Sequence, residues 1–140
     1  MKRKILVADD DLREIETLKS LLRPKYAVIL AYNGLEAVDV FNRRGEGGID
    51  GAILDYQMMG PGNNRLKSNE SHRQYYGDAV ARKFRDAGFT GPIIIRSMIA
   101  DMLGTNVQGL DVYLHKKNTG DEKILDYLVC KFQVIKSPKK

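Results

Sequence analysis

The chain has 140 residues, of which 43% are hydrophobic and 29% charged, a balance typical of one globular domain with a sizeable core. No apolar run is long enough to cross a membrane, and the first residues lack the apolar core of a signal peptide. The single cysteine, Cys130, excludes an internal disulfide framework. These features predict a cytoplasmic protein with no membrane partner.

The formal net charge of +5 arises at the two ends of the chain. Residues 2–4 and 136–140 contain six lysines and arginines, and without them the remaining chain carries −1. No basic stripe is interleaved with aromatic residues, so the charge pattern argues against a nucleic acid partner. We assign residues 1–136 to one domain and residues 137–140 to a basic tail.

Short apolar runs and helical periodicities alternate along the chain. The apolar runs predict five strands, at residues 4–8, 26–31, 51–54, 92–97 and 110–114. Apolar residues spaced three or four apart predict five helices, at residues 12–22, 35–41, about 71–87, 98–107 and from Asn118–Thr119 onward. Asp11 is expected to cap the first helix.

Strands that alternate with helices require an α/β fold with right-handed crossovers. We therefore predict a five-stranded parallel sheet in the order 2-1-3-4-5, flavodoxin-like, with helices on both faces. The helical patterns place Leu12 on the apolar side of the first helix, and Leu35, Val38 and Phe41 inward on the second. Cys130 lies in an apolar pattern and is expected to be a buried thiol.

Polar residues stand where four of the predicted strands end: Asp9 and Asp10, Asp55, Ser97, and Lys116. A lone aspartate at a strand end is often only a turn former or a helix cap. In a parallel sheet, however, these ends lie along one edge, and strands one and three are neighbours there. His72 and His115 have no ligand constellation around them in the sequence and are expected at the surface.

Three carboxylates in one crevice make one another costly to ionise, and a hard cation such as Mg²⁺ relieves that cost. A lysine and a serine hydroxyl beside them suit the oxygens of a phosphoryl group. The pattern therefore predicts in-line attack by an aspartate on phosphorus, which gives an acyl phosphate.

Five blocks of sequence, in order, resemble the receiver domains of two-component response regulators. They are Lys4–Asp11 (KILVADDD), Ala31–Ala37 (AYNGLEA), Ile53–Met58 (ILDYQM), Pro92–Ser97 (PIIIRS) and Gly109–Lys116 (GLDVYLHK). Each block alone is weak, but five in register span nearly the whole chain.

The resemblance implies a role for each residue of the site. Asp55 would accept the phosphoryl group from a histidine kinase or a histidine phosphotransfer protein. Mg²⁺ would be held by Asp10, Asp55 and the backbone carbonyl of Gln57, with Asp9 assisting through water. Ser97 and Lys116 would hold the phosphoryl oxygens, and Tyr113 would be the switch aromatic that moves with Ser97.

The resemblance also implies output by binding rather than by a separate enzymatic activity. A downstream protein would bind the face formed by the predicted helix at 98–107, the fifth strand and the last helix. The only catalysis would be the domain's own phosphorylation and dephosphorylation.

The chain departs from the family pattern at four places. Met59 and Gly60 come before Pro61, and Lys117 stands where proline usually follows the strand-five lysine. Gly60–Tyr76 is a longer segment than usual, and we expect a mobile surface element there. Met98 follows Ser97 in place of a small residue, and it would either limit access to the phosphoryl site or pack in the core.

The sequence also bears on three alternatives to this function. A haloacid-dehalogenase-like phosphatase needs a second aspartate two residues after its nucleophile, where this chain has Gln57. An interaction module independent of phosphorylation is disfavoured by the complete set Asp9, Asp10, Asp55, Ser97 and Lys116. The chain could also be a receiver excised from a hybrid histidine kinase.

Overall fold

The computed structural model describes residues 2–58, 73–98, 107–117 and 119–136, with side chains as far as residue 133. The elements are β1 (Lys4–Ala8), α1 (Leu12–Leu22), β2 (Ala27–Ala31), α2 (Gly34–Arg44), β3 (Gly51–Asp55), α4 (Gly77–Asp86), β4 (Ile93–Ser97), β5 (Tyr113–Lys116) and α5 (Glu122–Lys136). Within these ranges, no helix is long and apolar enough to span a membrane.

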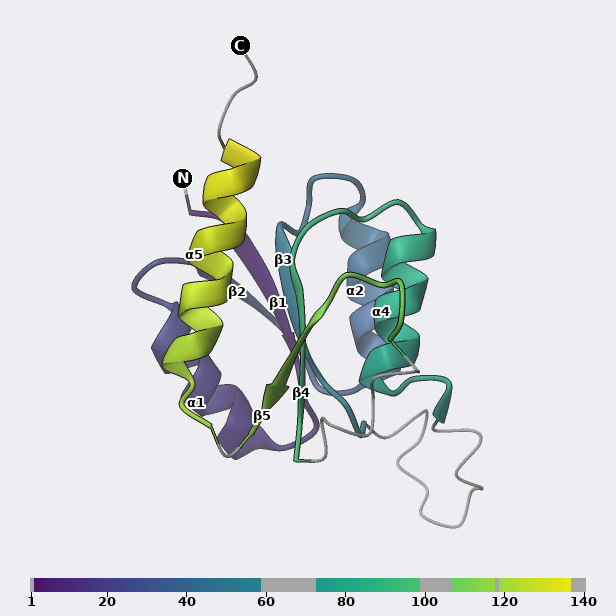
Figure 1. Cartoon of the computed structure of the whole chain (residues 1–140). Coiled ribbons are helices and arrows are strands. Elements are labelled where there is room, and N and C mark those ends of the chain that lie inside the picture. The colour runs from purple at the N-terminus through teal and green to yellow at the C-terminus, as the bar shows by residue number, and fades with distance from the viewer. Residues whose placement is uncertain (1, 59–72, 99–106, 118, 137–140) are drawn as a thin grey trace.

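The five strands form one parallel sheet in the order β2-β1-β3-β4-β5. Figure 1 shows α1 and α5 on one face of this sheet and α2 and α4 on the other. The predicted fold class, strand order and two-sided helix cover are therefore confirmed. Because every strand is parallel, β1, β3, β4 and β5 all end along the same edge.

Alternation along the central strands divides the core into two layers. Leu6, Leu54 and Ile95 pack with the α2 and α4 side, whereas Ile5, Val7, Ile53 and Ile94 pack with the α1 and α5 side. Every residue of β3 and β4 is buried, while β2 and β5 at the edges are only partly buried. Continuous apolar runs in β3 and β4 are thus the expected signature of strands covered on both faces.

The helix beginnings follow from local chemistry. Asp11 caps α1 by accepting a hydrogen bond from the Arg13 backbone N–H, as predicted, and Asn33 caps α2 by accepting one from Glu36. Gly45 follows α2 with a φ of 72°, a conformation that costs glycine little. These caps fix where the loops leave the sheet edge.

Several expectations from the helical periodicity need correction. On α2, Val38 and Phe41 are partly buried and pack against the core as predicted, whereas Leu35 is not among the residues packed there. The buried residues of the helix are Gly34, Ala37 and Val40. Helix α2 also extends at both ends beyond the predicted residues 35–41. Leu12 is 64% exposed because it stands at the first turn of α1, beyond the sheet edge.

Two further expectations are wrong. Cys130 is exposed on α5, because the buried stripe of that helix runs through Ile124, Leu128 and Phe132. His115 is buried, at 1% exposure, because it occupies an inward position of β5. The strand itself begins at Tyr113, three residues later than predicted, and the predicted helix at 98–107 and most of the segment at 60–76 lie outside the described residues.

Candidate functional site

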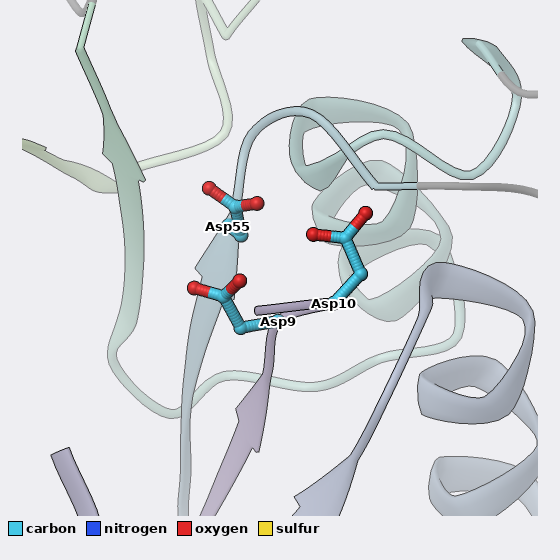
Figure 2. A group of neighbouring side chains, drawn as sticks. All are labelled: Asp9, Asp10 and Asp55. Carbon is cyan, nitrogen blue, oxygen red and sulfur yellow. The ribbon is translucent and has the colours of Figure 1, made fainter. Parts of the chain in front are cut away.

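Three carboxylates meet at the sheet edge where β1 and β3 end. Asp9, Asp10 and Asp55 each offer one oxygen, and these oxygens all lie within 4.8 Å of one another. Figure 2 shows the three side chains converging from the two strand ends onto one space. We call Asp9, Asp10 and Asp55 the carboxylate cluster. Asp9 and Asp55 are buried and Asp10 is exposed, so the cluster has one open side.

Asp55 is the last residue of β3 and is 6% exposed. Burial, with the charge of Asp9 as the next cause, raises the pKa of Asp55 to about 7. Lys117 opposes this shift, since its Nζ lies 2.7 Å from Asp55 Oδ1. The carboxylate is therefore poised between its charged and neutral forms near neutral pH, and any further cation would favour the charged form.

Asp9 is 1% exposed and uses its two oxygens differently. Oδ1 accepts a hydrogen bond of 2.9 Å from the Asp11 backbone N–H. Oδ2 is buried and has no hydrogen-bond partner in the described part of the chain. Two cationic groups lie just beyond hydrogen-bond distance of it: Arg96 Nη1 at 3.7 Å and Lys117 Nζ at 3.9 Å. Burial raises the pKa of Asp9, and the hydrogen bond from Asp11 only partly offsets this effect.

The lysine that reaches the carboxylate cluster is Lys117 and not the predicted Lys116. Side chains alternate between the faces of a strand, so Lys116 shares its face with Leu114, on the α2 and α4 side. Lys117 comes one residue later, and its backbone N–H donates to the Ser97 carbonyl, which holds it beside β4. Burial lowers the pKa of Lys117, but the hydrogen bond to Asp55 and the nearby carboxylate charges outweigh it and raise that pKa overall.

The other predicted site residues differ in how deeply they are buried near this edge of the sheet. Ser97 ends β4 and is buried, one residue beyond the Arg96 that pairs with Asp55 in register. Gln57 is exposed, and Met98 is 62% exposed, so Met98 is not a core residue. Tyr113 is half-buried and stacks on Tyr127 with ring centroids 4.8 Å apart. Its role as a switch, like the access role of Met98, stays a prediction.

A buried arginine beside the cluster was missed from the sequence. Arg96 directly follows the run Ile93–Ile95 in β4 and is 2% exposed. Its guanidinium contacts Asp9, Glu14 and Asp121, which come from the end of β1, from α1 and from the residue before α5. The available signal was a charged residue directly after three isoleucines in a strand predicted to be covered on both faces, because a buried charge needs partners.

The start of α4 is fixed against the end of β3. The Gly77 backbone N–H donates to the Tyr56 carbonyl at 2.7 Å. Arg73 forms a two-pronged pair with the buried Asp78, both contacts at 2.7 Å, and also lies over the rings of Tyr56 and Tyr76. The segment that leaves the site after Met58 is thus anchored again at residues 73–78.

The donor set suits a small hard cation. The carboxylate cluster supplies oxygen ligands only, and Asp9 Oδ2 is a buried acceptor that receives no hydrogen bond from the described residues. Mg²⁺ prefers oxygen ligands and commonly takes one or two carboxylates while it keeps several waters. The exposed side at Asp10 leaves room for those waters, so the residues present fit such an ion.

Comparisons by sequence find no matching family model and no matching curated protein. Comparison with solved structures finds many similar folds that cover nearly the whole chain. The Francisella response regulator 1452 receiver domain has 17% identity and a TM-score of 0.74, with 96% of this chain and 100% of that one covered. A two-component response regulator from Clostridium difficile has 24% identity and a TM-score of 0.71, with 97% and 100% covered.

A third similar structure is the BeF₃-activated DrrB receiver domain, with 18% identity, a TM-score of 0.72, and 95% of this chain and 99% of that one covered. At these identities the similarity is one of fold. The chain therefore has the fold of the response regulator receiver domains, over nearly its entire length.

Proposed function

We propose that this chain is a receiver domain that takes a phosphoryl group onto Asp55 in a Mg²⁺-dependent reaction in the cytoplasm. The donor would be a histidine kinase or a histidine phosphotransfer protein, and the response would be altered binding of a downstream protein. The observation that carries the proposal is the meeting of Asp55 with Asp9, Asp10 and Lys117 at one edge of a sheet with the receiver fold. No further enzymatic activity is proposed.

In the proposed reaction, a carboxylate oxygen of Asp55 attacks phosphorus in line with the leaving nitrogen of a phosphohistidine. The new bond joins Asp55 oxygen to phosphorus, and the phosphorus–nitrogen bond breaks. The nitrogen leaves with the electron pair and is neutral after it accepts a proton. The product is an acyl phosphate on Asp55 and a free histidine on the donor.

The chain's own groups prepare this step. Burial at the end of β3 removes most water from Asp55, and Lys117 holds one carboxylate oxygen in a fixed direction. When the phosphoryl group arrives, the Lys117 ammonium can contact one of its oxygens, since that group then carries the negative charge. Ser97, buried at the end of the neighbouring strand, is the proposed hydroxyl donor to another.

The proposed Mg²⁺ ligands are Asp10, Asp55 and the Gln57 backbone carbonyl, with Asp9 in support. A bound ion would supply positive charge close to the phosphoryl oxygens. It would also favour the ionised, nucleophilic form of Asp55.

Incubation with Mg²⁺ and a small phosphodonor such as phosphoramidate tests the proposal directly. Intact-protein mass spectrometry should show a gain of one phosphoryl group, which hydroxylamine removes. The gain should disappear in Asp55→Asn and persist in the control Asp39→Asn, which changes an exposed carboxylate on α2. An unmodified wild type, or a hydroxylamine-sensitive label that persists in Asp55→Asn, would contradict the assignment.

BeF₃⁻ gives an independent probe, because a receiver domain of this fold is known in a BeF₃-activated form. Together with Mg²⁺ it should stabilise the wild-type chain against heat, and it should have no such effect on Asp55→Asn. This measurement needs no phosphodonor and so separates a poor donor from a missing site.

A further inference from the structure

The buried guanidinium of Arg96 connects the carboxylate cluster to helix α1 and to the residue before α5. Its Nη2 lies 2.9 Å from Glu14 on α1 and 3.5 Å from Asp121, one residue before α5. Its Nη1 lies 3.7 Å from Asp9 Oδ2. We call Arg96, Asp9, Glu14 and Asp121 the Arg96 cluster. The Arg96 guanidinium thus contacts three carboxylates from three separate parts of the fold.

The contact between Arg96 and Asp9 is an ion pair without a hydrogen bond. Arg96 Nη1 and Asp9 Oδ2 are both buried, and neither has a hydrogen-bond partner among the described residues. At 3.7 Å they are an ion pair just beyond hydrogen-bond range. A shift of less than 1 Å would either make this bond or abandon it, and both groups are costly to leave unpaired.

Asp9 also faces the space where the cation would bind. Its Oδ2 has Arg96 on one side and Lys117, at 3.9 Å, on another, and it belongs to the carboxylate cluster. An ion drawn to Asp9 would therefore compete with Arg96 for the same carboxylate. A fixed positive charge a few ångströms from the ion also opposes its binding through space.

The far side of Arg96 leads to a second buried group. Asp121 Oδ1, which contacts Arg96, also lies 3.3 Å from His115 Nε2. His115 Nδ1 in turn lies 3.4 Å from the Tyr113 hydroxyl. A continuous line of polar contacts thus runs from Asp9 through Arg96, Asp121 and His115 to Tyr113.

We propose that Arg96 is a positioning residue that competes with the bound cation for Asp9 and transmits cation binding to Asp121 and His115 at the α5 side of the fold. The proposal rests on the proposed function only in placing a divalent cation at the carboxylate cluster. Without the ion, Arg96 is shared among Asp9, Glu14 and Asp121. With the ion bound, Asp9 turns to it, and Arg96 moves toward Glu14 and Asp121.

Calorimetric titration with Mg²⁺ tests the competition. Arg96→Met keeps an unbranched side chain of similar length but removes the charge, and we expect it to bind Mg²⁺ about tenfold more tightly. The matched control Arg43→Met removes an equal charge from the exposed far end of α2 and should leave the affinity unchanged. A gain in affinity cannot come from general loss of structure. Unchanged or weaker binding by folded Arg96→Met would overturn the competition.

A second pair of variants decides the question even if Arg96→Met fails to fold. Glu14→Gln removes the negative charge from the shortest contact of Arg96, so the guanidinium should turn more fully to the charged Asp9 and weaken Mg²⁺ binding severalfold. Glu16→Gln makes the same charge change on the same helix, at a side chain that is 67% exposed and contacts Lys19. Equal affinity in these two variants would overturn the competition.

Nuclear magnetic resonance of the histidine rings tests the transmission. The chain has two histidines, His72 and His115, so a His115→Gln variant assigns the signals. Mg²⁺ should shift the His115 ring signals in wild type and leave them unshifted in Arg96→Met. In Arg96→Lys, which keeps the charge without the fork that reaches several carboxylates at once, the affinity should stay near wild type while the His115 shift disappears.

The outcomes separate this proposal from the proposed function. A wild type that binds Mg²⁺ and is phosphorylated on Asp55, with a His115 shift that survives in Arg96→Met, would refute the transmission alone. A wild type that binds no Mg²⁺ at the carboxylate cluster would refute both proposals.

Discussion

At the scale of single residues, two adjacent lysines offer a clean comparison: Lys116, the last residue of β5, and Lys117, which follows it. Lys117 Nζ lies 2.7 Å from Asp55 Oδ1, whereas Lys116 faces the opposite side of the sheet. Lys117→Met should therefore slow phosphorylation by a small donor about a hundredfold, a typical cost of losing one preorganised charge-stabilising group. Lys116→Met should have little effect. Rates are compared by intact-mass spectrometry over time at saturating Mg²⁺.

In Lys117→Met we expect metal affinity and reaction rate to change in opposite directions. Removing the Lys117 charge beside Asp55 and Asp9 should tighten Mg²⁺ binding even as the reaction slows. If Lys116→Met were the slower variant, the motif-based assignment of Lys116 would be right and the side-chain placement of Lys117 would be wrong.

At the scale of elements, the start of α4 is held so closely to β3 that only glycine fits. A Cβ added to Gly77 would lie 2.5 Å from the Asp55 carbonyl oxygen and 3.1 Å from the Tyr56 Cα, both backbone atoms that cannot yield easily. Gly77→Ala should therefore push α4 away from the site and lower the free energy of unfolding by about 1–3 kcal/mol. Chemical denaturation measures the loss.

The displaced backbone includes that of Asp55, the proposed phosphoacceptor, so Gly77→Ala should also slow phosphorylation of Asp55. Asp86→Ala, at the exposed far end of the same helix, is the control and should change neither quantity appreciably. A Gly77→Ala variant as stable and as reactive as the control would show that α4 is not fixed to β3 in this way.

At the scale of the whole molecule, topology was readable from the sequence because it depends on long, regular signals. Apolar runs such as Ile93–Ile95 and the alternation of strands with helices required a parallel sheet covered on both faces, and the strand ends then brought Asp9, Asp10 and Asp55 together. Neither inference needed the position of any single side chain.

The features that could not be predicted depend on which way single side chains point and on which distant residues they contact. A shift of one position exchanges the two faces of a strand, so the sequence pattern placed Lys116 where the structure places Lys117. His115 appeared solvated because its partner Asp121 is a neighbour only through the turn after β5. Arg96 gained its meaning from carboxylates on three distant segments, which no local pattern links.

The raised pKa of Asp55 makes the stability of the whole domain depend on pH in an unusual direction. An unfolded Asp55 ionises near its ordinary pKa of 3.8, whereas the folded one ionises near about 7. Between these values the folded state holds a proton that the unfolded state has released. The free energy of unfolding should therefore fall as pH rises from about 4 to 7, by a few kcal/mol, and level off above that range. Burial of Asp9 adds to the same trend.

Thermal unfolding at several pH values, in chelator and in excess Mg²⁺, checks this prediction. In the proposed function Mg²⁺ binds the ionised carboxylates, so it should stabilise the domain more at pH 8 than at pH 5 and flatten the decline. Asp55→Asn cannot titrate at this position, and its stability should vary less with pH than that of wild type in chelator. If both proteins kept the same pH profile, Asp55 would be ionised throughout this range, and the Lys117 contact would outweigh the effect of burial.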